Sequence, residues 1–232
     1  MPRKMSASLS IVIPTLNAAS KIGPTLASLH EGIDIGLIKE LIITDGGSVD
    51  EIKIISEEIG AIFISGDAGR GTQLHNGALK TNAPWILFIH ADTILSKDWP
   101  NAAFEHITKY KDAGYCKLAF DDNGFMPKII SLGANLRSHL FGLPYGDQCL
   151  LISRELYNEI GGYLKIPLME DVAMAKALKG RLRVMPIKAI TSSERYRAEG
   201  WITRSIKNIA LVIKFIFGWD SGELANFYKP KN

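Results

Sequence analysis

The chain has 232 residues, of which 47% are hydrophobic and 22% are charged, and this balance is typical of soluble globular proteins. Its 27 basic and 24 acidic residues leave a formal net charge of +3, which is too small to favour nucleic acid as the main partner. The two cysteines, Cys116 and Cys149, form no C-x-x-C unit, so neither a disulfide framework nor a zinc site is expected.

No apolar run in the sequence has the length of a targeting or membrane segment. A membrane-spanning helix needs about 20 apolar residues. The first apolar run, Leu9–Ile13, stops at Pro14 and is too short for the core of a signal peptide. No linker, repeat or low-complexity tract divides the chain. We therefore expect a single domain over residues 1–232 in a cytoplasmic protein.

The first hundred residues alternate between short apolar runs and amphipathic segments. The apolar runs predict strands at Leu9–Ile13, Leu41–Ile43, Ala61–Ile64 and Trp85–Ile89. Helices are predicted between them at Ser20–His30, Ser48–Ile59 and Thr72–Lys80. The runs lack polar alternation, as expected for strands buried on both faces of a parallel sheet. This rhythm predicts an α/β fold with a mostly parallel central sheet flanked by helices.

The second half of the chain is less regular. Strands are predicted at Ala113–Phe120 and Cys149–Ile152, with a broken final strand at Arg183–Ile190. Helices are predicted at Lys128–Leu140 and Asp171–Lys179, and a long closing helix at Gly200–Phe217.

Each of the first four strands is followed by polar residues. In an open parallel sheet the carboxyl ends of the strands line the ligand-binding crevice. The residues concerned are Pro14, Thr15, Asn17, Thr44, Asp45, Asp67, Arg70, His90 and Asp92. Any one of them could be an ordinary loop or cap residue, but four strand ends together favour a binding site. Because these ends offer carboxylates and no thiols, the cation that fits them is Mg²⁺ or Mn²⁺.

Other nucleotide-binding and hydrolytic motifs are incomplete or absent. Gly69-x-Gly71 lacks the third glycine of a dinucleotide-binding loop, and Gly46-x-Ser48 lacks the closing glycine of a nucleophile elbow. The sequence contains neither a P-loop nor an H-E-x-x-H zinc motif.

An ordered set of motifs resembles glycosyltransferase family 2, whose members have the GT-A fold. The motifs are S-I-V-I-P-T-L-N at Ser10–Asn17, I-T-D-G-G-S-V-D at Ile43–Asp50, F-I-H-A-D-T at Phe88–Thr93, G-L-P-Y-G-D-Q at Gly142–Gln148, G-G-Y at Gly161–Tyr163 and P-L-M-E-D-V at Pro167–Val172. Each motif alone is weak evidence for the family, but the order and spacing of the whole set over residues 9–200 are specific to it.

The resemblance implies an inverting transfer of a sugar from a nucleotide-diphosphate sugar to an acceptor hydroxyl. The residues implied to bind the donor are Pro14, Thr15, Asn17, Asp45, Arg70 and Ala91. Arg70 would approach the diphosphate, together with amides at the start of its helix. The nucleotide-binding half would span about residues 9–95, the acceptor half about 96–200, and the closing helices 200–228.

The resemblance also implies a metal site and a catalytic base. Asp92, with His90, would hold Mn²⁺ or Mg²⁺ between the two phosphates. Asp171, paired with Glu170, would deprotonate the acceptor hydroxyl. His90 departs from the usual D-x-D pattern and gives H-A-D, which resembles a bacterial branch of the family.

Simpler interpretations exist for these residues when each is taken alone. Asp171 could cap a helix, and Asp45 could belong to a turn. Arg70 could be a solvated charge, and His90 a hydrogen-bonded core residue. The motif Q-x-x-R-W of processive synthases is absent, with Glu194–Tyr196 in that region, so a single transfer is expected.

The closing helix is unusually apolar over Ile209–Trp219. It is expected to pack on the domain, to form a homodimer, or to lie on the inner face of a membrane near a lipid-linked acceptor. Two other functions stay open from the sequence alone. One is a nucleotidyltransferase, which would be expected to carry a glycine-rich, basic loop after the first strand; the loop here is neither. The other is a non-catalytic nucleotide-sugar-binding protein.

Overall fold

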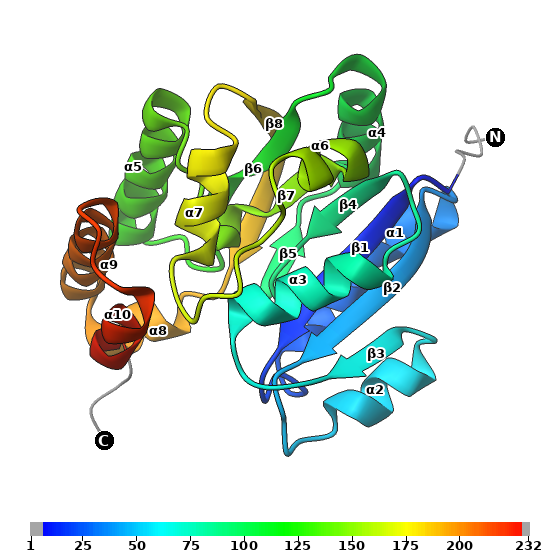
Figure 1. Ribbon diagram of the computed structural model, residues 1–232, viewed down its shortest axis with the longest axis horizontal. Helices are drawn as coiled ribbons and strands as arrows, with labels where there is room; N and C mark the ends of the chain where they lie inside the picture. The colour runs from blue at the N-terminus through cyan, green and yellow to red at the C-terminus, as the bar shows by residue number, and fades with distance from the viewer. Residues whose placement is uncertain (1–6, 229–232) are drawn as a thin grey trace.

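A computed structural model describes residues 7–228 of the chain, and the basic start of the sequence lies outside this range. Eight strands form one sheet in the order β3-β2-β1-β4-β7-β6-β8-β5 (Figure 1). The strands are β1 Leu9–Thr15, β2 Ile38–Asp45, β3 Ile62–Ser65, β4 Trp85–Phe88, β5 Thr93–Leu95, β6 Ala113–Phe120, β7 Leu150–Ser153 and β8 Leu182–Thr191.

Parallel strands build the first half of the sheet, as predicted. β1 lies between β2 and β4 and is parallel to both, and β3 continues the sheet beyond β2. The register pairs Thr15 with Asp45, so the polar ends of β1 and β2 lie side by side. β1 is buried on both faces, whereas β3 is an edge strand that leaves Ile62 exposed.

Antiparallel pairings enter the second half, where β7 lies between β4 and β6 and runs against both. β6 and β8 are parallel, and β5 pairs antiparallel with β8 at the far edge. The predicted break in β8 is a register irregularity opposite Tyr115–Lys117, within a strand that is otherwise continuous. Pro186 lies in this stretch and has no amide hydrogen to donate to the ladder.

Helices cover both faces of the sheet (Figure 1). They are α1 Ile22–Asp34, α2 Ile52–Glu58, α3 Arg70–Lys80, α4 Trp99–Lys109, α5 Phe125–Phe141, α6 Arg154–Glu159, α7 Glu170–Ala177, α8 Glu194–Glu199, α9 Trp201–Ile216 and α10 Ser221–Tyr228, with a 3₁₀ turn, η1, at Gly146–Gln148. The sequence analysis located most of these helices, and its closing helices over residues 200–228 include both α9 and α10. It did not predict the strand β5 or the helices α4, α6 and α8. It began α5 three residues late, at Lys128.

Two hydrophobic clusters fill the space between the sheet and its helices. Leu9, Ile11 and Ile13 face one cluster, and Val12 faces the other, because successive side chains of a strand point to opposite faces. Cys116 and Cys149 are buried in the first cluster and form no disulfide with each other.

A third, smaller cluster attaches the C-terminal helices to the domain. Leu211 and Val212 of α9 and Leu224 of α10 pack against residues at the start of α7. The predicted closing helix therefore has one packed face. No helix among residues 7–228 has the length and apolar character needed to cross a membrane.

Candidate active site

The ends of β1 and β2 are held together by Asp45. Its carboxylate accepts hydrogen bonds from Thr15 Oγ1 at 3.0 Å, from the Gly47 amide at 2.9 Å, and from both the amide, at 2.7 Å, and the hydroxyl of Ser48. Burial alone would raise the pKa of Asp45, but these hydrogen bonds outweigh it and hold the pKa below its ordinary value. Asp45 is 3% exposed and lies behind the cavity wall that Thr15 helps to form.

Two further side chains fix the loops around these strand ends. Asn17 has a left-handed backbone (φ 49°), and its side-chain oxygen accepts a hydrogen bond from the Val49 amide at 3.1 Å. Gln73 of α3 donates to the backbone oxygens of Thr15 and Thr44, each at 2.7 Å. Gln73 therefore fixes the start of α3 against both strands, a role that the sequence analysis did not assign.

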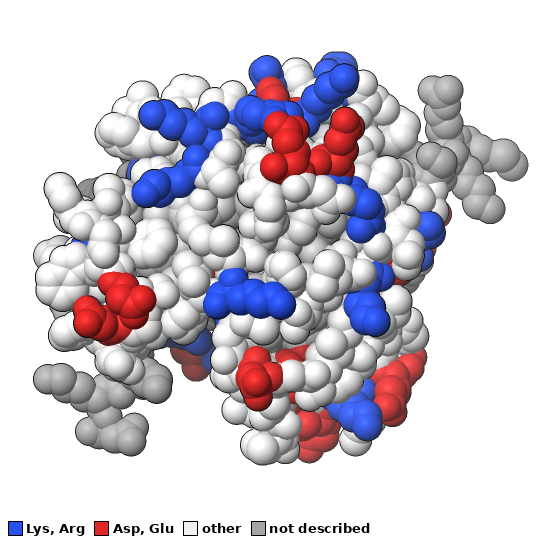
Figure 2. Space-filling model, viewed as in Figure 1, with Lys and Arg blue, Asp and Glu red and all other residues white. Residues whose placement is uncertain are grey.

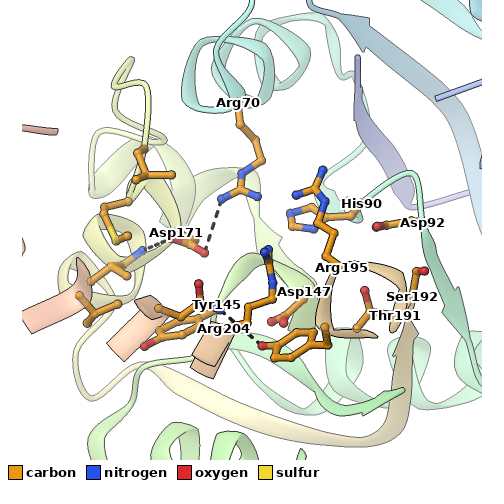
Figure 3. A pocket seen from close by; sticks show the side chains of 16 residues that line it. Arg70, His90, Asp92, Tyr145, Asp147, Asp171, Thr191, Ser192, Arg195 and Arg204 are labelled. Atoms are coloured by element: carbon orange, nitrogen blue, oxygen red, sulfur yellow. Dashed lines mark hydrogen bonds and ion pairs between the residues drawn. The ribbon is translucent and has the colours of Figure 1, made fainter. Parts of the chain in front are cut away.

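Arg70 begins α3 and reaches across the cavity to the start of α7 (Figure 3). Its guanidinium forms an ion pair with Glu170 and lies 3.9 Å from Asp171 Oδ2. Glu170 is 1% exposed, and its pKa is raised, chiefly by burial, although Arg70 opposes this change. Asp171 lines the cavity, and its carboxylate accepts a hydrogen bond from the Gly146 amide at 2.8 Å. The adjacent carboxylates thus have different surroundings.

His90 and Asp92 follow β4 on the opposite wall of the cavity (Figure 3). Burial, together with the nearby charges of Arg70 and Arg195, lowers the pKa of His90 to about 3. The imidazole is therefore neutral at physiological pH. It also packs against Gly146, because a Cβ at that position would lie 2.6 Å from His90 Nε2.

The η1 turn is held in place by α5. Arg137 stacks on the Tyr145 ring at 3.3 Å, and Ser138 Oγ donates to the buried side chain of Gln148 at 2.6 Å. Gln148 donates in turn to the backbone oxygen of Cys116 at 3.2 Å. These contacts place Asp147 in the cavity. Burial raises its pKa to about 6; Arg137 opposes the rise, and Asp171 adds to it.

Two cavities meet along a shared wall that includes Arg70, His90, Asp92 and Arg195. The larger one extends over the β1 end and is lined by Pro14, Thr15, Asn17, Gly69, Gln73 and Ala91, among others. The smaller one borders η1 and is lined by Tyr145, Asp147, Asp171, Thr191, Arg204 and Asn208, among others. Most of the residues predicted for the site converge on this double cavity. Asp45 and Glu170 lie behind the walls, and neither Thr44 nor Asp67 lines either cavity.

Among residues 7–228, no three His, Cys, Asp or Glu side chains gather closely enough to hold a metal ion by themselves. Asp92 and the neutral His90 nevertheless offer an oxygen and a nitrogen donor to the same cavity. Both donor types suit Mn²⁺, and Mg²⁺ favours the oxygen. This set fits a cation whose remaining ligands come from phosphate oxygens and water.

The profile of glycosyl transferase family 2 matches residues 10–138, more than half of the chain. The chain belongs to this family. Membership confirms the family resemblance and disfavours a nucleotidyltransferase. A glucosyl-3-phosphoglycerate synthase of Mycolicibacterium smegmatis is 30% identical over 100 residues, covering 39% of this chain and 33% of the relative. A synthase of the same name from Mycobacterium tuberculosis has the same identity, covering 31% of its length, so the matches span about a third of these curated relatives.

Solved structures confirm the predicted GT-A fold. A mannosyltransferase of Pyrobaculum calidifontis, in complex with GDP-Man and Mn²⁺, has a TM-score of 0.67 at 15% identity, over 95% of this chain and 68% of that one. TarS of S. aureus, in complex with UDP-GlcNAc, has a TM-score of 0.59 at 16% identity, over 81% of this chain and 59% of that one.

Several residues that line this double cavity were not singled out from the sequence. Arg195 and Arg204 lie on α8 and α9, beyond the family match, and Asp147 lies within a quoted motif without an assigned role. Two signals in the sequence could have indicated them. Asp147 is a charged residue inside a quoted motif, and Arg195 lies in the region of the Q-x-x-R-W motif of processive synthases.

Proposed function

We propose that the protein transfers a sugar from a nucleotide-diphosphate sugar to an acceptor hydroxyl, with inversion at the anomeric carbon. The observation that carries this proposal is that Asp92, Arg70 and Asp171 all line the smaller cavity, and that Asp92 and Arg70 also border the larger one. A leaving diphosphate needs positive charge, and an attacking hydroxyl needs a nearby base. This cavity offers both.

The donor nucleotide would occupy the larger cavity. Pro14, Thr15, Asn17 and Ala91 would line the nucleoside pocket. Asp45 would act on this pocket indirectly, because its hydrogen bonds fix Thr15 and the loop at Gly47 and Ser48.

The diphosphate would lie where the two cavities join. Arg70 and Arg195 both border this region and would neutralise the phosphates. Asp92 and His90 would hold Mn²⁺ or Mg²⁺ against the same phosphates, and the cation would supply Lewis-acid stabilisation of the leaving group. The neutral state of His90 supports this role, because only a neutral imidazole has a lone pair to offer.

The acceptor would enter the smaller cavity. Asp171 would take the proton of its hydroxyl, and the hydrogen bond from the Gly146 amide would hold the carboxylate in place. Glu170 would act through Arg70, whose guanidinium it orients from a buried position.

The experiment is to incubate the protein with a panel of UDP- and GDP-sugars, Mn²⁺ and a mixture of hydroxyl acceptors, and to measure nucleoside diphosphate release. Release that depends on one donor, on Mn²⁺ and on acceptor is expected. A protein that binds a nucleotide sugar without turnover under all these conditions would instead be a non-catalytic binder, and the proposal would be abandoned.

A further inference from the structure

Helix α5 turns polar residues toward the sheet and apolar residues outward, the reverse of an ordinary surface helix. Its side toward the sheet carries Asn135, which exchanges hydrogen bonds with the backbone of Leu118, and the buried Ser138. Its outer side carries large apolar residues that are between 46% and 76% exposed: Phe125, Ile129, Leu132, Leu136 and Leu140. These residues recur at spacings of three and four and so form one stripe along the helix.

Helix α9 contacts α5 and carries a second stripe of the same kind. Ile202, Ile206, Ile209, Ile213 and Ile216 are between 45% and 63% exposed, whereas Leu211 and Val212 pack inward. Both helices lie at one end of the molecule, beyond the sheet (Figure 1). An exposed apolar surface formed by two adjacent helices marks an interaction site, because isolated apolar side chains are common on surfaces and long stripes are not. We refer to these two stripes as the α5–α9 face.

The charges on the two helices have only one sign. The 17 residues of α5 and the 16 residues of α9 include no Asp or Glu. They include Lys128 on α5, which is exposed, and Lys214 on α9, whereas Lys207 of α9 forms an ion pair with Glu199 at 3.8 Å. In Figure 2 the surface where α9 lies is largely uncharged, and acidic groups gather near α10. This pairing of apolar and cationic groups is complementary to an anionic lipid surface.

A second copy of the chain fits this face less well. A two-fold dimer would place the same cationic helices opposite each other, and like charges across an interface disfavour association. Trp219 lies three residues after the end of α9, and the ammonium of Lys214 is 4.7 Å from the centroid of its ring. Aromatic and cationic side chains of this kind are typical of the boundary between headgroups and acyl chains.

We propose that the α5–α9 face docks the protein on the surface of an anionic phospholipid bilayer. The helices would lie in the interface, with their apolar stripes among the acyl chains and their lysines among the headgroups. This extends the expectation for the closing helix to a face made by two helices, one of which precedes η1 in the chain.

Docking would also bring the smaller cavity close to lipid. The inward side of α9 supplies Arg204 and Asn208 to that cavity, while its outward side carries the apolar stripe. The consequence, which rests on the proposed function, is that an acceptor hydroxyl on an amphiphilic molecule at the membrane surface would reach Asp171 by a short path.

The test is vesicle flotation of the full chain at about 0.1 M and about 1 M ionic strength. Vesicles of phosphatidylcholine alone are compared with vesicles that also contain phosphatidylglycerol. We expect the protein to float with the anionic vesicles at low salt and to bind them at least about ten-fold less at high salt or without phosphatidylglycerol. Flotation needs no turnover, so its failure is distinguishable from failure of the proposed function.

Paired variants locate the surface. Leu132→Gln with Leu136→Gln alters α5, and Ile206→Gln with Ile209→Gln alters α9; each pair is expected to reduce vesicle binding about ten-fold or more. The matched control is Ile54→Gln with Leu79→Gln, since these residues are exposed on α2 and α3. Circular dichroism verifies that every variant is folded.

Three results would overturn the proposal. The first is that the protein stays with the soluble fraction at low salt in the presence of anionic vesicles. The second is that the control pair weakens binding as much as the α5 and α9 pairs do. The third is that light scattering finds a dimer which the α5 and α9 pairs dissociate, because the face would then be an interface between copies.

Discussion

At the scale of single residues, the adjacent carboxylates Glu170 and Asp171 differ in what they can do. Glu170 is buried against Arg70, and Asp171 opens onto the cavity. We expect Asp171→Asn to lower turnover by about 10² to 10⁴, because the amide cannot accept the acceptor proton. Donor binding should change little. Nucleoside diphosphate release and calorimetry with the donor measure the two effects.

The control for this prediction is Glu155→Gln. Glu155 is an acidic residue in the first turn of α6, as Asp171 is in α7, but it does not line either cavity. If both variants lose activity equally, the effect of Asp171 comes from helix capping. Near-normal turnover of Asp171→Asn would remove this carboxylate from the mechanism.

The proposed metal site is tested at Asp92. Because Asp92 offers the only carboxylate directly after β4, Asp92→Ala should weaken the binding of both Mn²⁺ and nucleoside diphosphate, by about ten-fold or more. Calorimetry with and without EDTA measures both affinities. His90→Asp restores the D-x-D pattern and is expected to tighten Mn²⁺ binding. Diphosphate affinity that ignores both the chelator and the Asp92 variant would contradict the metal bridge.

Asp147 makes the stability of the metal-free protein depend on pH. Burial raises its pKa to about 6, above the 3.8 of a solvated Asp, so the folded protein holds this proton more tightly than the unfolded chain does. The stabilisation is present below pH 4 and is lost as the pH rises through 6. Asp147→Asn should therefore raise the free energy of unfolding at pH 8 by on the order of 2 kcal/mol.

The same variant should have little effect at about pH 3, where both states of the wild-type residue are largely protonated. Urea unfolding in EDTA at both pH values measures the difference. An equal effect at the two pH values would mean that Asp147 acts through packing and not through its charge.

The sequence motifs predicted which residues would gather at the cavities, but they did not predict which side chains these residues would contact. The motifs brought Thr15, Asp92 and Asp171 to one cavity. They could not indicate that the carboxylate of Asp45 accepts hydrogen bonds from Thr15 and from its own loop at Gly47 and Ser48, since that depends on the conformation of the loop and its distance from β1. Nor could they indicate that Arg70 pairs with Glu170, which lies 100 residues further along the chain.

At the scale of elements, the η1 turn needs a glycine because His90 occupies the space beside it. A Cβ on Gly146 would lie 2.6 Å from His90 Nε2 and 3.5 Å from Asp171 Oδ2. We expect Gly146→Ala to displace the imidazole or the turn and so to misplace Asp171, with a loss of turnover of about 10²-fold. Steady-state kinetics should find a lower kcat. The KM for the donor should be almost unchanged if the turn moves and raised if the imidazole of His90 moves.

The double variant His90→Ala, Gly146→Ala separates this steric contact from a general weakening of the fold. Removal of the imidazole makes room for the new methyl group, so the combined loss should be smaller than the product of the two single losses. If the loss of turnover in the double variant equals the product of the two single losses, Gly146 is needed for a reason other than the space that His90 occupies.

Elements with a regular apolar pattern were predictable, and elements fixed by tertiary contacts were not. The predicted start of β1 at Leu9 is correct, because a run of apolar residues marks this strand in the sequence. β5 has three residues and exists only through its pairing with β8. Helix α5 was located, but its reversed amphipathicity depends on Asn135 bonding to β6, and a helical period cannot indicate which stripe faces inward.

At the scale of the whole molecule, the sheet continues from the strands of the first half of the chain into those of the second half through the antiparallel pairing of β4 with β7. The ion pair between Arg70 of α3 and Glu170 of α7 adds a second connection across the cavity. The sequence predicted one domain only from the lack of a linker. The sheet topology gives a physical reason to expect that both halves unfold together.

We therefore expect a single urea transition, with coincident curves from far-ultraviolet circular dichroism and from the fluorescence of the buried Trp85 and Trp99. Arg70→Ala should lower the free energy of unfolding by on the order of 2–3 kcal/mol, since it leaves the buried Glu170 without its partner. The transition should nevertheless remain single. Arg181→Ala is the matched control, because its pair with Glu159 is exposed and a change there should have little effect. Two separated transitions in the wild-type protein would mean that the halves are independent domains joined by a shared sheet edge.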